Sequence, residues 1–130
     1  MPKDSILIID DDPDTIEFLR IVFTVRGHEL VGAHTGTEGL RVARSRPFDL
    51  ILVDVMMPDI DGYEVCRQLR ADPVTAAIPI VILTARSSLV DQTLGLEAGA
   101  DRFLIKPVGI SILTDMADAL IAAHRQGQSS

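Results

Sequence analysis

Four short apolar runs of this sequence each end at a side chain with acid, alcohol or amine chemistry. The residues at these ends are Asp10 and Asp11, Asp54, Thr84, and Lys106. Carboxylates that meet in one crevice repel one another and lose hydration, so they need a cation. Oxygen ligands alone favour a hard divalent ion such as Mg²⁺, which keeps several of its waters. The sequence therefore predicts a Mg²⁺ site, provided that the fold brings these ends together.

The other groups of this set suit a phosphoryl group. Lys106 offers a flexible point charge that pairs with a carboxylate or a phosphoryl oxygen, and the hydroxyl of Thr84 can donate to an anion. The loop after Asp54 can add a backbone carbonyl as a metal ligand, and Met56 is best placed for it. Together these groups predict a phosphoryl-binding site with one carboxylate in position to attack.

Hydrophobic patterns predict five strands that alternate with five helices. The strands are short apolar runs at residues 6–9, 30–33, 50–53, 80–83 and 102–105. The helices show apolar residues at helical spacing, at about 13–26, 35–46, 61–70, 88–98 and 110–125. The fourth helix has the sparsest apolar face, made of Leu89, Val90 and Leu94, and we expect it to be the most loosely held.

Capping residues define several helix ends. Asp12 before Pro13 has the arrangement of an N-cap, so we interpret Asp12 as a cap and not as a member of the site. Thr35 and Asp61 are expected to cap the second and third helices, and Gly99 to close the fourth.

The alternation of strands and helices predicts one α/β domain over residues 1–125, with residues 126–130 as a flexible C-terminal tail. Right-handed crossovers favour a doubly wound parallel sheet, and with five strands the usual order is 2-1-3-4-5. This order places the first and third strands side by side, and ligands of such sheets bind beyond the carboxyl ends of the strands. The predicted site residues all lie at that end.

Composition narrows the classes of function. The net charge is −7 and there is no basic stripe, which argues against nucleic acid as a direct partner. No apolar run approaches the roughly 18 residues of a membrane span, and the amino end lacks the features of a signal peptide. The single cysteine, Cys66, fits a reducing compartment and a small core residue. We therefore expect a cytoplasmic protein with no membrane partner.

The motifs of the chain resemble those of a known family. They are Ile-Leu-Ile-Ile-Asp-Asp-Asp-Pro at 6–13, Asp54-Val-Met-Met-Pro58 with Asp61-Gly62, Thr84-Ala85, and Phe103-Leu-Ile-Lys106-Pro107. Over essentially the whole length they resemble the chemotaxis-regulator-like receiver domains of response regulators in bacterial two-component signalling. The resemblance implies a flavodoxin-like (βα)5 fold.

The resemblance also implies a phosphoacceptor role in a two-component or phosphorelay system. Asp54 would accept a phosphoryl group from phosphohistidine on a sensor histidine kinase or a histidine phosphotransfer protein. The implied Mg²⁺ ligands are Asp11, Asp54 and the Met56 carbonyl, with Asp10 contributing through water. Thr84 and Lys106 would bind the phosphoryl oxygens, and Lys106-Pro107 is expected to be a cis bond.

A conformational switch would follow phosphorylation. Thr84 would move inward and Phe103 would enter the vacated space, unless Phe103 is a plain core aromatic, since the family often has Tyr there. The face made by the fourth helix, the fifth strand and the fifth helix would then change for a downstream protein or an attached effector domain. The chain would be a stand-alone receiver or a piece of a longer regulator.

Three alternatives remain. A Mg²⁺-dependent phosphatase with an aspartyl nucleophile would place that residue after its first strand in an Asp-x-Asp motif, whereas Met56 stands two residues after Asp54. A receiver-like module that is never phosphorylated is disfavoured because no key position is degraded. Flavin binding lacks a Gly- and Thr-rich loop after the first strand. We therefore expect a phosphoacceptor switch that assists its own phosphorylation and dephosphorylation, and not an enzyme.

Overall fold

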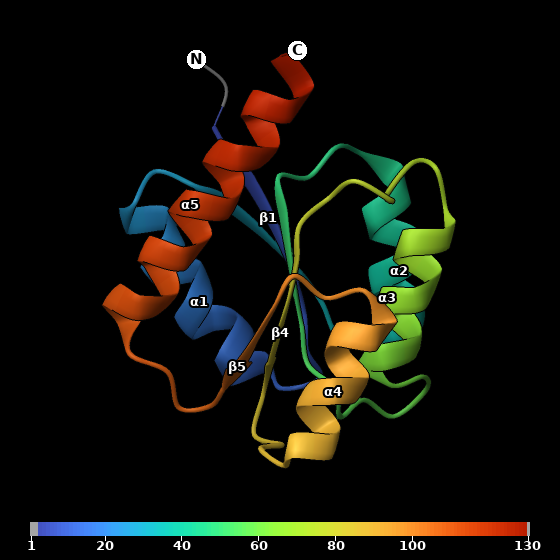
Figure 1. The fold of residues 1–130 in the computed structure, drawn as a ribbon. Helices are drawn as coiled ribbons and strands as arrows, with labels where there is room; N and C mark the ends of the chain where they lie inside the picture. Colours follow the sequence, from blue (N-terminus) through green and yellow to red (C-terminus); the bar gives the residue numbers. More distant parts are fainter. Residues whose placement is uncertain (1–2, 130) are drawn as a thin grey trace.

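Parallel strands and helices alternate along the chain in the computed structural model, which describes residues 3–129 (Figure 1). The strands are β1 (Ser5–Ile9), β2 (Glu29–Ala33), β3 (Leu50–Val53), β4 (Ile80–Thr84) and β5 (Arg102–Ile105). The helices are α1 (Pro13–Val25), α2 (Gly36–Ser45), α3 (Gly62–Ala71), α4 (Leu89–Ala98) and α5 (Ile110–Ser129). The strands pair in the order β2-β1-β3-β4-β5, which confirms the predicted fold.

The sheet is the middle of three layers. Helices α1 and α5 cover one face, and α2, α3 and α4 cover the other (Figure 1). Successive residues of a strand point to opposite faces, so Leu7 and Ile9 pack on the side of α2 and α3, whereas Ile6 and Ile8 pack against α1 and α5. β1, β3 and β4 are buried on both faces, which explains why their sequences are almost continuously apolar.

The predicted caps are confirmed. The side chain of Asp12 accepts the N–H of Asp14 at 3.0 Å, and Pro13 is the first residue of α1. Thr35 and Asp61 cap α2 and α3 in the same way. Gly99 ends α4 in the left-handed region, with φ of 112°, where a side chain would be strained.

Two expectations about helices need correction. Helix α5 does not end near Arg125 but continues to Ser129 through most of the predicted tail, of which Ser130 lies outside the described residues. In α4 the apolar residues predicted to face inward, Leu89 and Val90, are 78% and 67% exposed. The buried residues of α4 are Gly95 and Ala98, because the helix approaches β5 through small residues.

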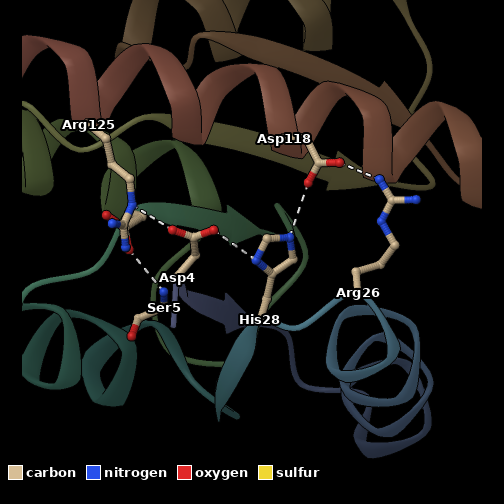
Figure 2. Close-up of polar contacts among 7 residues, drawn as sticks. Asp4, Ser5, Arg26, His28, Asp118 and Arg125 are labelled. Atoms are coloured by element: carbon tan, nitrogen blue, oxygen red, sulfur yellow. Dashed lines mark hydrogen bonds and ion pairs between the residues drawn. The ribbon is translucent and has the colours of Figure 1, made fainter. Parts of the chain in front are cut away.

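A chain of polar contacts lies at the amino end of the sheet (Figure 2). His28, which is buried, lies between two carboxylates, with Nδ1 3.2 Å from Asp4 and Nε2 3.1 Å from Asp118. Arg26 pairs with Asp118, and Arg125 pairs with Asp4. Because Asp118 and Arg125 both belong to α5, these contacts fasten that helix to the starts of β1 and β2, at the end of the sheet opposite the predicted site.

Two further expectations concern single features. Cys66 is fully buried on α3, as expected of a small core residue, and burial raises the pKa of its thiol to about 12. Within residues 3–129, none of the helices has the length and apolar character that a membrane span requires.

Candidate functional site

The neighbouring strands β1 and β3 bring two buried carboxylates to the same end of the sheet. Ile9 is in register with Val53, and the N–H of Asp54 donates to the carbonyl of Ile9 at 2.9 Å. Asp10 and Asp54 therefore follow directly on paired strands, and they are only 1% and 8% exposed. The strand order thus assembles the two acids that the sequence predicted.

Lys106, which follows β5, joins these two acids. Its Nζ donates to Oδ2 of Asp10 at 2.7 Å and to Oδ2 of Asp54 at 3.1 Å. The remaining carboxylate oxygens accept backbone N–H groups, from Asp12 at 2.9 Å and from Met56 at 3.2 Å. The Lys106-Pro107 peptide bond is cis, which confirms the expectation from the resemblance.

Burial and pairing compete in setting the charges of this cluster. Burial raises the pKa of Asp10 above its ordinary value, although hydrogen bonds from Lys106 and Asp12 offset part of the rise. Burial alone would lower the pKa of Lys106, but the hydrogen bonds and attraction from Asp10 and Asp54 outweigh it and raise that pKa. Lys106 is therefore an ammonium at neutral pH, and a single positive charge faces two buried carboxylates.

An open cavity of about 410 Å³ lies beside the loop that follows Asp54. Its lining residues are Asp11, Val55, Met56, Met57, Pro58, Asp61 and Arg86. Carboxylates and a guanidinium therefore share its walls, and Met56, which is more than half exposed, stands at its surface. A charged ligand can reach the end of β3 from this side.

The donor set fits a hard cation that keeps most of its water. Asp11 is exposed and lines the cavity. Among the described residues, no three His, Cys, Asp or Glu side chains lie close enough to form a metal site by themselves. Mg²⁺ needs only one or two carboxylates when waters and substrate oxygens complete its shell. The oxygens of Asp11, Asp54 and the Met56 carbonyl suit such an ion, and their roles as ligands stay predictions.

The two remaining predicted residues lie on β4 and β5. Thr84 is fully buried, its hydroxyl accepts the N–H of Arg86 at 3.4 Å, and its carbonyl accepts the N–H of Lys106 at 2.8 Å. Phe103 is half-buried and packs against the core cluster on the side of α3 and α4. Thr84 is therefore next to Lys106, and Phe103 packs against Gly95 of α4, while the switch role of both residues stays a prediction.

Sequence reasoning missed a residue that fixes the loop after Asp54. Asp59 accepts the N–H groups of Gly36 and Thr37 at 2.9 and 2.8 Å, so it binds the first turn of α2 from 22 or more residues away. The position of Asp59 directly after Pro58 indicates a turn, but nothing in the surrounding sequence identifies Gly36 and Thr37 as its hydrogen-bond partners. The loop that carries Met56 is thereby fixed at its far end.

Comparison with known proteins agrees with this geometry. The sequence model of the response regulator receiver domain matches residues 6–118. The chain belongs to this family. The receiver domain is 44% identical over 125 residues to the transcriptional regulatory protein AfsQ1 of Streptomyces coelicolor, covering 95% of this chain and 52% of that protein. It is 43% identical over 105 residues to the DNA-binding response regulator MtrA of Mycobacterium tuberculosis, covering 81% of this chain and 45% of that protein.

The solved structures agree as well. A CheY-like response regulator receiver domain protein from Methanospirillum hungatei superposes with a TM-score of 0.90 at 26% identity, covering 97% of this chain and 99% of that one. The receiver domain spans about half the length of the curated relatives above.

These names correct one prediction. The net charge of −7 predicts no direct nucleic-acid partner, but relatives that match over this segment are named DNA-binding response regulator (MtrA) and DNA-binding dual master transcriptional regulator (RpaA). The exclusion was wrong because nucleic-acid binding depends on where basic residues cluster. The net charge of a segment that spans half of such a protein does not decide what the protein binds.

Proposed function

We propose that this receiver domain is a phosphoacceptor switch in which Asp54 takes a phosphoryl group from phosphohistidine on a sensor histidine kinase or a histidine phosphotransfer protein. The observation that carries the proposal is the double contact of the Lys106 ammonium with Asp10 and Asp54, whose chain neighbours Asp11 and Val55 line an open, charged cavity. Family membership supports the same reading.

The transfer forms a bond between a carboxylate oxygen of Asp54 and phosphorus and breaks the bond between phosphorus and the imidazole nitrogen, which keeps the electron pair. Asp54 is ready to react because its backbone is fixed by pairing with β1 and its carboxylate is held by Lys106 and Met56. Lys106 neutralises charge on the incoming oxygens, and Thr84 can turn its hydroxyl toward them.

A bound Mg²⁺ ion would neutralise the charge that gathers as a dianion meets the acids of the site. Asp11, Asp54 and the Met56 carbonyl would hold it, with Asp10 acting through water. Asp10 also keeps Lys106 in place, since it is the more deeply buried of the two acids that this ammonium contacts.

We propose that the output passes from the face formed by α4, β5 and α5. Its exposed large apolar residues are Leu89, Val90, Leu94, Leu96, Ile105, Ile110 and Ile112. In a protein of about twice this length, as AfsQ1 and MtrA are, that face would act on residues outside this segment, and DNA binding would be the regulated activity. The cytoplasmic location stays a prediction, based on the single cysteine and the amino end without signal-peptide features.

Mass measurement tests the proposal. Incubation with a small phosphoryl donor and Mg²⁺ should add one phosphoryl group to the wild type and none to Asp54→Asn, and chelation of the metal should prevent the addition. A stoichiometric adduct that is slowly lost supports a switch. Steady turnover of a generic phosphate ester would instead support the phosphatase alternative, and an unmodified wild type would refute phosphoacceptor function.

A further inference from the structure

The first turn of α4 is held by one carboxylate. Asp91 accepts the phenol of Tyr63 on α3 at 2.9 Å and the hydroxyl of Ser88, the N-cap of α4, at 2.6 Å. The N–H of Asp91 donates back to the Ser88 hydroxyl at 3.0 Å. Tyr63 is 6% exposed, and burial followed by the hydrogen bond to Asp91 raises the pKa of its phenol to about 12, so it stays a neutral donor. This carboxylate therefore joins α4 to α3 as well as to its own cap.

Tyr63 is connected to the phosphoacceptor through the backbone. It follows Gly62, whose N–H donates to the carbonyl of Val55 at 3.0 Å. A Cβ at Gly62 would lie 2.4 Å from the carbonyl oxygen of Asp54, so the start of α3 packs directly on the residue that would be phosphorylated. A change at Asp54 is thus one residue away from the phenol that holds Asp91.

A second connection reaches Asp91 from β4. Arg86 Nη1 lies 3.7 Å from Oδ1 of Asp91, and the Arg86 N–H donates to the Thr84 hydroxyl at 3.4 Å. Arg86 is half-exposed and lines the cavity beside Asp11 and Met56. An exposed ion pair of this length is weak, so a stronger anion inside the cavity can compete for the guanidinium.

The rest of α4 is held by few contacts. Its leucine and valine side chains are exposed, and its buried residues are Gly95 and Ala98 in the second half. Gly95 packs closely on Phe103 of β5 and Ile82 of β4. The first half therefore depends on Asp91, whereas the second half is fixed by close packing on the sheet.

We propose that Tyr63, Asp91 and Arg86 form a latch on the first turn of α4, which a phosphoryl group on Asp54 opens by drawing Arg86 away from Asp91. The added negative charge attracts the guanidinium and repels the Asp91 carboxylate. The first turn of α4 then loses its cation and loosens, while the second half stays packed on β5. This inference rests on the proposed function for its trigger, but not for the latch itself.

Hydrogen exchange of the full chain tests the resting latch without phosphorylation. Tyr63→Phe should speed amide exchange at residues 90–95 by about tenfold, the change expected from losing one hydrogen bond to a charged group. The matched control is Thr93→Val, which removes a hydroxyl bond to the Leu89 carbonyl within α4 and leaves Asp91 untouched. Unchanged exchange in Tyr63→Phe, or an equal rise in Thr93→Val, would overturn the latch.

The trigger is tested with beryllium fluoride and Mg²⁺ as the phosphoryl mimic. In the wild type the mimic should speed exchange at residues 90–95. In Arg86→Gln resting exchange should already be faster and should change little on adding it. Arg67→Gln, which removes another exposed arginine pair, should respond as the wild type does. A full response in Arg86→Gln would refute the trigger, whereas failure of the mimic to raise the wild-type melting temperature would refute the proposed function.

Discussion

Replacing Lys106 with Met removes the only cation that contacts both buried acids among the described residues. The ammonium is 2.7 Å from Asp10 and 3.1 Å from Asp54, and the Asp10 side chain is 1% exposed. Breaking a buried pair by removing one partner costs about 3–5 kcal/mol. Since the Lys106 side chain is 25% exposed, water can replace part of the lost interaction, and we expect a loss of about 3 kcal/mol near neutral pH.

The loss should depend on pH. Without Lys106, burial and repulsion from Asp54 raise the pKa of Asp10 further above its ordinary value near 4. A carboxyl whose pKa is raised on folding favours the folded state most at pH values below its unfolded pKa, and that stability is lost as the pH rises through the folded pKa. Lys106→Met should therefore be less destabilised near pH 5 than near pH 7.5.

Urea denaturation measures this difference, followed by far-ultraviolet circular dichroism because the chain has no tryptophan. The other lysine, Lys3, is exposed, and Lys3→Met is the matched control, expected to be near neutral at both pH values. Adding Asp10→Asn to Lys106→Met should restore stability, since it removes the uncompensated charge. Equal losses at both pH values, or no rescue by Asp10→Asn, would show that Lys106 stabilises the fold by packing and not by charge.

Three more predictions concern other parts of the domain. Asp59→Ala should lower the free energy of unfolding measured by urea denaturation by about 1 kcal/mol. Hydrogen bonds from Thr37 and the neighbouring backbone hold the pKa of Asp59 low. The stability that Asp59 contributes to the wild type is therefore present above about pH 4 and is lost as the pH falls below that value. Gly95→Ala should destabilise by about 1–3 kcal/mol in thermal unfolding, although alanine favours helices, because its Cβ would lie 2.7 Å from the Phe103 ring. Millimolar Mg²⁺ should raise the melting temperature of the wild type and raise that of Asp11→Asn less. An equal rise in both proteins would show that Asp11 is not a ligand of the metal ion.

The strands and the centre of the site could be predicted because their signals are local. A strand buried on both faces must be apolar throughout, so Ile80 to Leu83 is visible as a run, and the residue that ends each run is fixed by counting. The order 2-1-3-4-5 is the usual one for five such strands, and it decides that Asp10 and Asp54 meet. Periodicity located the strands and the acids that follow them, and the usual order of such sheets predicted that the acids lie together.

Contacts between distant segments could not be predicted in this way. The Tyr63 hydroxyl donates a hydrogen bond to Asp91, which lies 28 residues further along the chain. Neither residue stands out in the sequence from other residues of its helix. The orientation of α4 was missed for a related reason. Leu89 and Val90 dominate its apolar pattern, yet the helix meets the sheet through Gly95, which carries no hydrophobic signal.

The excess of acids at the site and the few contacts of α4 together predict where the domain responds to phosphorylation. The acids at the ends of β1 and β3 are already in excess over their lysine, so a phosphoryl group on Asp54 adds negative charge where burial makes it most costly. The sheet beneath is close-packed and cannot yield by small amounts. The added repulsion must be reduced by the movement of cations and of segments held by few contacts. Helix α4 is such a segment, because its first turn is joined to α3 through the carboxylate of Asp91. The response to phosphorylation should therefore begin at the first turn of α4 and leave its second half packed on β5.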